Sequence, residues 1–191
     1  MKNIITKNFI FILLFSTLNP LLVAKEYKNL EYINFYAIAI PKIWKTLRDP
    51  VDENCMLVGK NVDYKKSKFT ASICVLHLSP KDALRESGFF VIDNNWIKGG
   101  SMDSGMAKIE YKKDFTSISG SASCGISDSA GFHAAGGTCF TYLVFGADYS
   151  VRIDGNGDIN LNNDIQKIIK TLKIKCRLPE NIIKEIFSND H

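Results

Sequence analysis

The stretch that decides the fold class is TCFTYLVFGADYSVRID, residues 138–154. Two runs rich in residues that favour β-strands flank a tight turn, Gly146-Ala147-Asp148. A short glycine-containing connection between two such runs is a strong signal for a β-hairpin. The stretch therefore predicts two antiparallel strands, 138–146 and 149–154.

Further strands are predicted on the N-terminal side of this hairpin. Residues 107–113 alternate between polar and apolar, and residues 115–126 place Ser117, Ser119, Ser121 and Ser123 on one face of a strand. A short apolar run at 55–59 and the run KFTASICVLHL at 68–78 predict a second hairpin, centred near residues 64 and 65. Another β-rich run, 32–40, ends at Pro41, which cannot donate a ladder hydrogen bond.

Three segments have helical signals. Ser79 precedes Pro80, as an N-cap residue precedes proline in the first turn of a helix. Ile165, Ile168, Ile169 and Leu172 form one apolar stripe, and residues 179–187 form a last short helix. Residues 90–106 are ambiguous. These elements predict an α+β domain, with helices packed against a central antiparallel sheet of about six or seven strands.

The N-terminal 24 residues have the pattern of a secretory signal peptide. Lys2 and Lys7 precede the apolar run 9–15, a polar break follows, and Ala24 supplies a small residue at the cleavage position. The interrupted run is too short for a spanning helix. We therefore expect a single exported domain, 25–191, in the periplasm or outside the cell and without a membrane anchor.

Five cysteines lie within residues 25–191, and disulfides are the default in an oxidising compartment. Centring the hairpin near residues 64 and 65 puts Cys55 opposite Cys74, which predicts a cross-strand disulfide. Cys124 and Cys139 bracket a glycine-rich segment and are expected to pair at its base. Because five is odd, one cysteine is left over, and Cys176 is the expected free thiol.

The order of these elements resembles the PsbP/Mog1-type sandwich. The residues that carry the resemblance are IPKIW after the opening strand and YSVRIDGNGDINLNNDIQKIIKTLKI at the closing hairpin and helix. Some exported bacterial immunity proteins, which neutralise delivered toxins, have this layout. The resemblance implies a binding scaffold and carries no functional residue onto this chain.

The cysteine-bracketed segment 124–139 is the principal candidate site. Cys124, His133 and Cys139 lack the short paired spacings and the fourth ligand of a structural zinc site. A Cys–His nucleophile would need one free cysteine. The remaining interpretation is a disulfide-clipped recognition loop with Phe132 and His133 near its tip. The serine face of 115–126 is expected to be solvated, and its flatness makes Ser117, Ser119 and Ser121 candidate contact residues.

A second candidate is the segment 154–164, which has a partial calcium-loop pattern. Asp154, Asn156 and Asp158 match the first three ligand positions. However, Ile159 replaces the glycine of the sharp turn and Ile165 replaces the bidentate glutamate. A loop leading into a helix cap is the competing interpretation.

The sequence predicts a non-enzymatic binding protein that needs no cofactor. The net charge of +4 is small and evenly spread, so nucleic acid is not an expected partner. The leading hypothesis is an immunity-type protein that blocks a secreted toxin through residues 124–139. The alternatives are a periplasmic small-ligand or accessory module and, third, a hydrolase that uses His133.

Overall fold

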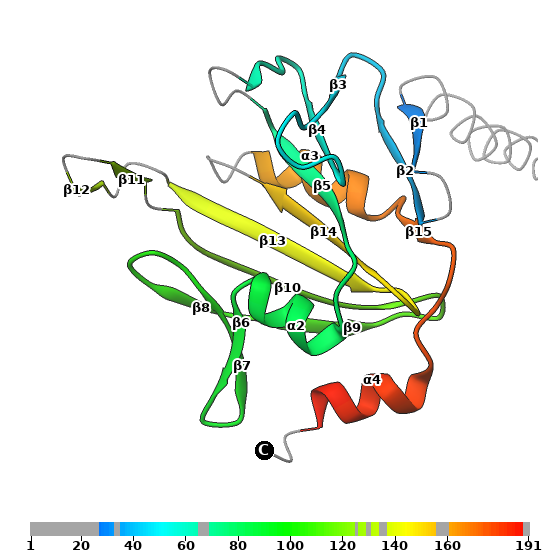
Figure 1. Ribbon diagram of the computed structural model, residues 1–191, viewed down its shortest axis with the longest axis vertical. Helices are drawn as coiled ribbons and strands as arrows, with labels where there is room; N and C mark the ends of the chain where they lie inside the picture. Colours follow the sequence, from blue (N-terminus) through cyan, green and yellow to red (C-terminus); the bar gives the residue numbers. More distant parts are fainter. Residues whose placement is uncertain are drawn as a thin grey trace, which may run out of the picture.

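A seven-stranded antiparallel sheet forms the centre of the fold, and the helices and two smaller sheets lie on its two faces (Figure 1). The computed structural model describes residues 27–32, 35–64, 69–124, 126–128, 131–133, 137–155 and 161–188. The expected signal peptide, 1–24, lies outside this range. In spatial order the central strands are β3 (Lys45–Arg48), β4 (Cys55–Gly59), β5 (Ala71–Leu76), β14 (Ser150–Gly155), β13 (Thr138–Phe145), β10 (Thr116–Ser123) and β9 (Lys108–Tyr111).

Both predicted hairpins are present in this sheet. In the β13–β14 hairpin, Phe145 pairs with Ser150 next to a turn closed by a hydrogen bond from Gly146 N to the Tyr149 carbonyl. In the β4–β5 hairpin, Cys55 pairs directly with Cys74, and a disulfide joins them. This confirms the predicted cross-strand bond. The free cysteine is Cys176, as predicted.

One face of the central sheet is covered by a three-stranded sheet and one helix. The small sheet contains β1 (Tyr27–Tyr32), β2 (Tyr36–Pro41) and β15 (Lys173–Ile174), and the helix is α3 (Leu161–Ile169). Ile38 of β2 and Ile168 of α3 are buried in one core with Tyr142 and Val144 of β13. The apolar stripe of α3 that the sequence predicts is therefore the side that packs on the sheet.

The opposite face is covered by two helices and a second three-stranded sheet. The helices are α2 (Pro80–Glu86) and α4 (Glu180–Phe187), and the sheet contains β6 (Phe89–Ile92), β7 (Asn95–Gly99) and β8 (Ser104–Met106). Phe89 of β6 and Ile183 of α4 share a core with Leu143 and Phe145 of β13. Alternate residues of β13 thus enter two separate cores, as a strand covered on both faces requires.

The predicted α+β class is wrong, because the protein is mainly β. Among the described residues the three helices have seven, nine and eight residues, and strands make up most of the remaining regular structure. The physical reason is that hairpins take most of the covering positions. Strand β2, which overlaps the run predicted as a strand at 32–40, and strands β6 to β8, mostly within the ambiguous run 90–106, belong to the two small covering sheets and bury Ile38 and Phe89 in the two cores.

Tyr149 joins three segments at one end of the molecule. Its hydroxyl donates to the carbonyl of Phe35, 2.5 Å away, and accepts from the backbone N–H of Cys176 at 3.4 Å. Its ring also packs edge-on against Phe35. The hydroxyl therefore ties the start of β2 and the segment after β15 to the β13–β14 turn.

Tyr149→Phe is expected to lower the free energy of unfolding by about 1 kcal/mol at neutral pH, the usual net value of one hydrogen bond. Burial raises the pKa of Tyr149 above its ordinary value of 10.0. The unfolded chain therefore loses this proton first, and the contribution of the phenol disappears as the pH rises above 10. Urea unfolding of both proteins should show a stability difference that shrinks in this alkaline range. A constant difference would contradict this account.

Candidate functional site

The small sheet β6-β7-β8 presents one face to the core and one to solvent. Phe89 pairs with Lys98, and the next pair along the hairpin is Phe90 with Ile97. Since successive residues of a strand point to opposite faces, Phe89 and Phe90 lie on different faces. Phe89 is 3% exposed and belongs to the core, whereas Phe90 is 41% exposed.

The solvent-facing side of this sheet is apolar. Ile97 pairs with Met106 of β8, which continues the row begun by Phe90. Met106 is 67% exposed, and Met102 in the β7–β8 turn is 65% exposed. We call this surface the apolar face; it consists of Phe90, Ile92, Ile97, Met102 and Met106.

Exposed apolar side chains are concentrated in this part of the molecule. Twelve large apolar side chains are exposed among the described residues, and four of them, Phe90, Ile92, Met102 and Met106, belong to the apolar face. Scattered exposed apolar residues are normal in soluble proteins, but a contiguous group marks an interaction site. The apolar face is therefore the strongest candidate for a binding surface in the described part of the chain.

Glycines allow the small sheet to lie directly against β10. A Cβ atom added to Gly100 would come within 2.7 Å of the Ala122 side chain and of the Ser123 backbone. A Cβ on Gly105 would overlap the carbonyl oxygen of Ser121. Side chains at these two positions would push β8 away from the central sheet. The apolar face is thus supported by close backbone packing beneath it.

The β7–β8 turn is also fixed by hydrogen bonds to Ser123. The Ser123 hydroxyl accepts from Met102 N at 2.9 Å, and Ser123 N donates to the Asp103 carboxylate at 2.6 Å. Hydrogen bonds from the backbone and the hydroxyl of Ser123 lower the pKa of Asp103. The carboxylate is therefore ionised at neutral pH, which keeps these contacts in place.

The candidate segment 124–139 begins one residue after this anchor. Cys124 and Cys139 form the predicted disulfide, and Cys124 N donates to the Gly137 carbonyl. Because the two sulfur atoms are joined in this disulfide, neither is a thiolate that could bind zinc or act as a nucleophile. Because Ser123 contacts the turn that carries Met102, the base of the clipped segment adjoins the apolar face.

The clipped segment contains a short hairpin of its own. Strands β11 (Ile126–Asp128) and β12 (Gly131–His133) pair antiparallel, with Ser127 opposite Phe132 and Ile126 opposite His133. The hairpin lies beyond the ends of β10 and β13 (Figure 1). The side chains of Phe132 and His133 lie outside what the structure describes, so their predicted role in binding stays a prediction.

The predicted serine face requires a correction. Ser117 is 1% exposed, because it lies opposite Val144 beneath the β1-β2-β15 layer. Its hydroxyl has no hydrogen-bond partner among the described residues. Ser117 therefore cannot contact a partner and is not solvated. Ser119 and Ser121 are half-buried.

The first residue of the predicted calcium loop is already engaged by protein groups. Thr141 Oγ1 donates to Asp154 Oδ1 at 2.9 Å. Arg152 Nε lies 2.7 Å from Asp154 Oδ2 in an ion pair whose angle is not that of a hydrogen bond. Asn156 and Asp158 lie outside the described residues. In the described ranges no group of three or more His, Cys, Asp or Glu side chains could hold a metal ion.

Lys98 lies where the small sheet meets the central one. Its ammonium donates to the Gly99 carbonyl at 2.8 Å and lies 5.9 Å from the centre of the Phe89 ring. Burial lowers the pKa of Lys98, and Asp154 partly offsets this effect. The amine thus lies against the Phe89 ring of the neighbouring strand β6 and a carbonyl of its own strand β7, on the side opposite the apolar face.

The turn between β6 and β7 is the signal that sequence reasoning missed. Asp93 and Asn94 both have positive φ, 48° and 62°. A two-residue connection with two positive φ values is typical of a type I′ hairpin turn, and Asp and Asn tolerate it better than other side chains. The run FFVI-DN-NWIKG at 89–99 could therefore have indicated a hairpin.

The sequence matches no protein-family model, and no curated protein matches it. None of the helices in the described ranges is long and apolar enough to cross a membrane. The two disulfides fit a secreted or periplasmic protein.

Proposed function

We propose that this protein is an exported binding protein whose partner is another protein. The observation that supports this most strongly is the concentration of exposed apolar side chains on the outer side of β6-β7-β8. In the proposal, Phe90 and Met106 form the centre of the contact, and the clipped segment 124–139 extends it at one end. No catalytic step is assigned to the chain.

The particular partner that we propose is a secreted toxin, which the protein blocks as a periplasmic immunity protein. The features in favour are the N-terminal signal-peptide pattern, the two disulfides and the resemblance in sequence to the PsbP/Mog1-type sandwich, a layout that some exported immunity proteins share. A surface anchored by glycine contacts and hydrogen bonds changes little on binding. Such a surface suits tight inhibition, because little ordering entropy is lost.

A second candidate function is small-ligand binding, and one cavity favours it. A cleft of about 580 Å³ lies between the β1-β2-β15 layer and the loop at 112–115. Its lining includes Lys112, Lys170 and Lys173, together with Asp114 and Thr171. Lys112 already contacts Glu110 at 3.3 Å, which leaves Lys170 and Lys173 to attract an anionic ligand.

Capture of a partner by the exported protein, followed by measurement of its affinity, tests the proposal. Replacing Phe90 and Met106 with serine should weaken that affinity about 100-fold, because hot spots cluster near the centre of an interface and buried aromatic anchors are common among them. The matched control replaces Leu78 and Ile182, which are 40% and 36% exposed outside the apolar face. The control should bind as the natural protein does.

Growth of cells that export the captured partner supplies the functional readout. Co-export of the natural protein should restore growth, and co-export of the Phe90→Ser, Met106→Ser variant should not.

Phe132→Ala with His133→Ala should weaken binding without a loss of thermal stability. Equal affinity of the Phe90→Ser, Met106→Ser variant and the control would contradict the proposed surface. A harmless partner would remove the toxin assignment and leave the binding surface in place.

A further inference from the structure

The outer edge of β3 is open within the described part of the chain. On one side β3 pairs with β4, and no described strand pairs with it on the other. All four of its side chains are exposed. An open edge carries unpaired backbone donors and acceptors, and these can accept another strand.

The ladder with β4 determines which backbone groups point outward. Asp49 N donates to the Cys55 carbonyl, so Leu47 and Lys45, two and four residues earlier, also direct their backbone groups toward β4. The intervening residue Thr46 is opposite Val58, whose carbonyl accepts from Thr70 on the far side. Thr46 and Arg48 therefore direct their N–H and C=O groups to the open edge.

These directions allow a two-fold symmetric register centred on each of the four residues of β3, and the register centred on Lys45 places two ammonium groups opposite each other. A register centred on Arg48 places two guanidinium groups opposite each other, which is unfavourable. A register centred on Thr46 places Lys45 opposite Leu47 of the second copy. In a register centred on Leu47, the backbone of Thr46 forms hydrogen bonds with Arg48 of the second copy, and Lys45 lies opposite Asp49 of the second copy.

Only the register centred on Leu47 is complementary in both charge and polarity. It brings the two exposed leucines together and matches each lysine with a carboxylate. Asp49 Oδ1 accepts from Val51 N at 2.9 Å, and its other oxygen faces no described cation within ion-pair distance. That oxygen is available to Lys45 of a second copy.

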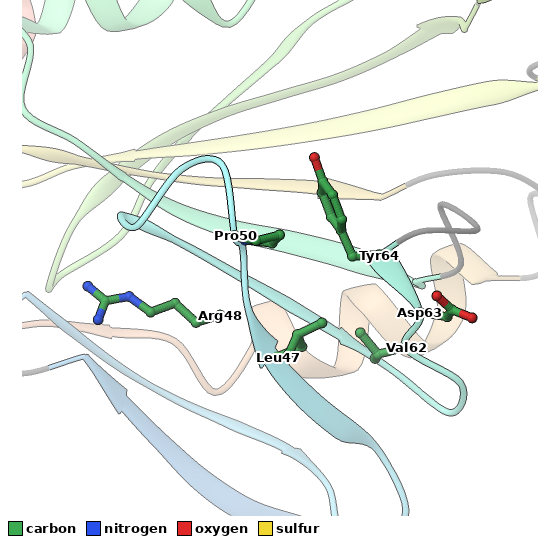
Figure 2. Close-up of a pocket in the computed structure, with 6 residues that line it drawn as sticks. All are labelled: Leu47, Arg48, Pro50, Val62, Asp63 and Tyr64. Atoms are coloured by element: carbon green, nitrogen blue, oxygen red, sulfur yellow. The ribbon is translucent and has the colours of Figure 1, made fainter.

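Apolar groups surround the centre of this register. Leu47, Pro50, Val62 and Tyr64 line a hollow of about 450 Å³ beside the strand, together with the charged residues Arg48 and Asp63 (Figure 2). Ile43 and Val51 flank the two ends of β3 and are 72% and 78% exposed. Antiparallel pairing brings the Ile43 end of one copy beside the Val51 end of the other, so both become partly covered.

We propose that two copies of this chain associate through antiparallel pairing of their β3 edges, with the two-fold axis at Leu47. The pairing joins the two central sheets into one. It uses the opposite end of the sheet from β9 and leaves the apolar face uncovered, so it does not depend on the proposed toxin-binding function.

Disulfide trapping tests both the contact and its register. The exported protein carries Cys176→Ser to remove the exposed free thiol. In the proposed register Leu47 faces itself as a non-hydrogen-bonded pair, whose Cα atoms lie about 4.5 Å apart and within disulfide reach. Leu47→Cys should therefore form a covalent dimer under mild oxidation, and the matched variant Lys45→Cys should remain monomeric. Cross-linking by Lys45→Cys alone, or by neither variant, overturns the proposal.

Sedimentation analysis of the same Cys176→Ser protein supplies the second test. Thr46→Pro removes an outward N–H and leaves the β4 ladder intact, and proline is tolerated at strand edges. It should weaken dimerisation at least about ten-fold, since each copy loses one intermolecular hydrogen bond. Thr46→Val keeps the N–H and should dimerise normally. If the Cys176→Ser protein with its natural β3 sequence stays monomeric at every concentration, the proposal is overturned.

Discussion

Replacement of Phe145 by alanine is expected to lower the free energy of unfolding by about 4 kcal/mol, within the usual range for a buried phenylalanine. Phe145 is fully buried, and its ring lies 5.7 Å from the ring of Phe187 in an edge-on arrangement. It belongs to the core in which α4 and the small sheet pack on β13. Replacement by alanine would remove one of the ring contacts through which α4 packs on the sheet.

Two further variants separate this effect from general sensitivity to mutation. Phe145→Leu fills most of the cavity and should cost less than half as much. Phe90→Ala should be nearly neutral, because Phe90 is 41% exposed on the apolar face. Urea unfolding of the three variants measures these differences. Equal losses for Phe145→Ala and Phe90→Ala would contradict the assignment of core and surface faces in this region.

Removal of the Cys55–Cys74 disulfide is the second change with a large expected effect. The two residues are 19 apart in sequence, and a loop of that size contributes about 3 kcal/mol in the chain-entropy model. Both residues are also buried, at 5% and 2% exposure, so replacement by alanine leaves a cavity in the sheet. Cys55→Ala with Cys74→Ala should therefore cost about 4 kcal/mol in total.

The Cys124–Cys139 disulfide provides the matched comparison. Its sequence separation of 15 gives a similar entropic contribution, but both residues are partly exposed at the base of the clipped segment. Cys124→Ala with Cys139→Ala should cost about 3 kcal/mol, without the additional cavity contribution. Denaturant unfolding of the two double variants measures the difference. A larger loss from the second pair would show that the clipped segment contributes more to the global fold than its position indicates.

Local patterns were sufficient for the central hairpins and for the pairing of the cysteines. In a hairpin, residues at equal distances from the turn lie opposite each other. The position of the turn was therefore enough to place Cys55 opposite Cys74. The covering layers were not predictable in the same way. Strands β1 and β2 pair with each other, and the two-residue strand β15, which is far away in the sequence, completes their sheet. Such pairing depends on tertiary contacts that no local pattern contains.

The candidate site shows the same limit. Alternation correctly placed the serines of β10 on one face, but it carries no information on whether another layer covers that face. Ser117 is buried because the β1-β2-β15 layer lies over it. Conversely, the apolar run at 89–92 indicates burial, yet Phe90 and Ile92 are exposed because only one side of β6 has the core to pack against.

Hydrogen–deuterium exchange of the exported protein, with and without its captured partner, tests the central claim most directly. A contact on the apolar face predicts slower exchange at 89–106 and at residues 123, 124 and 137–139, with unchanged exchange in the hollow beside β3. Protection confined to 43–64 or to the cleft at 112–115 and 170–173, with none at 89–106, would contradict the proposed binding surface.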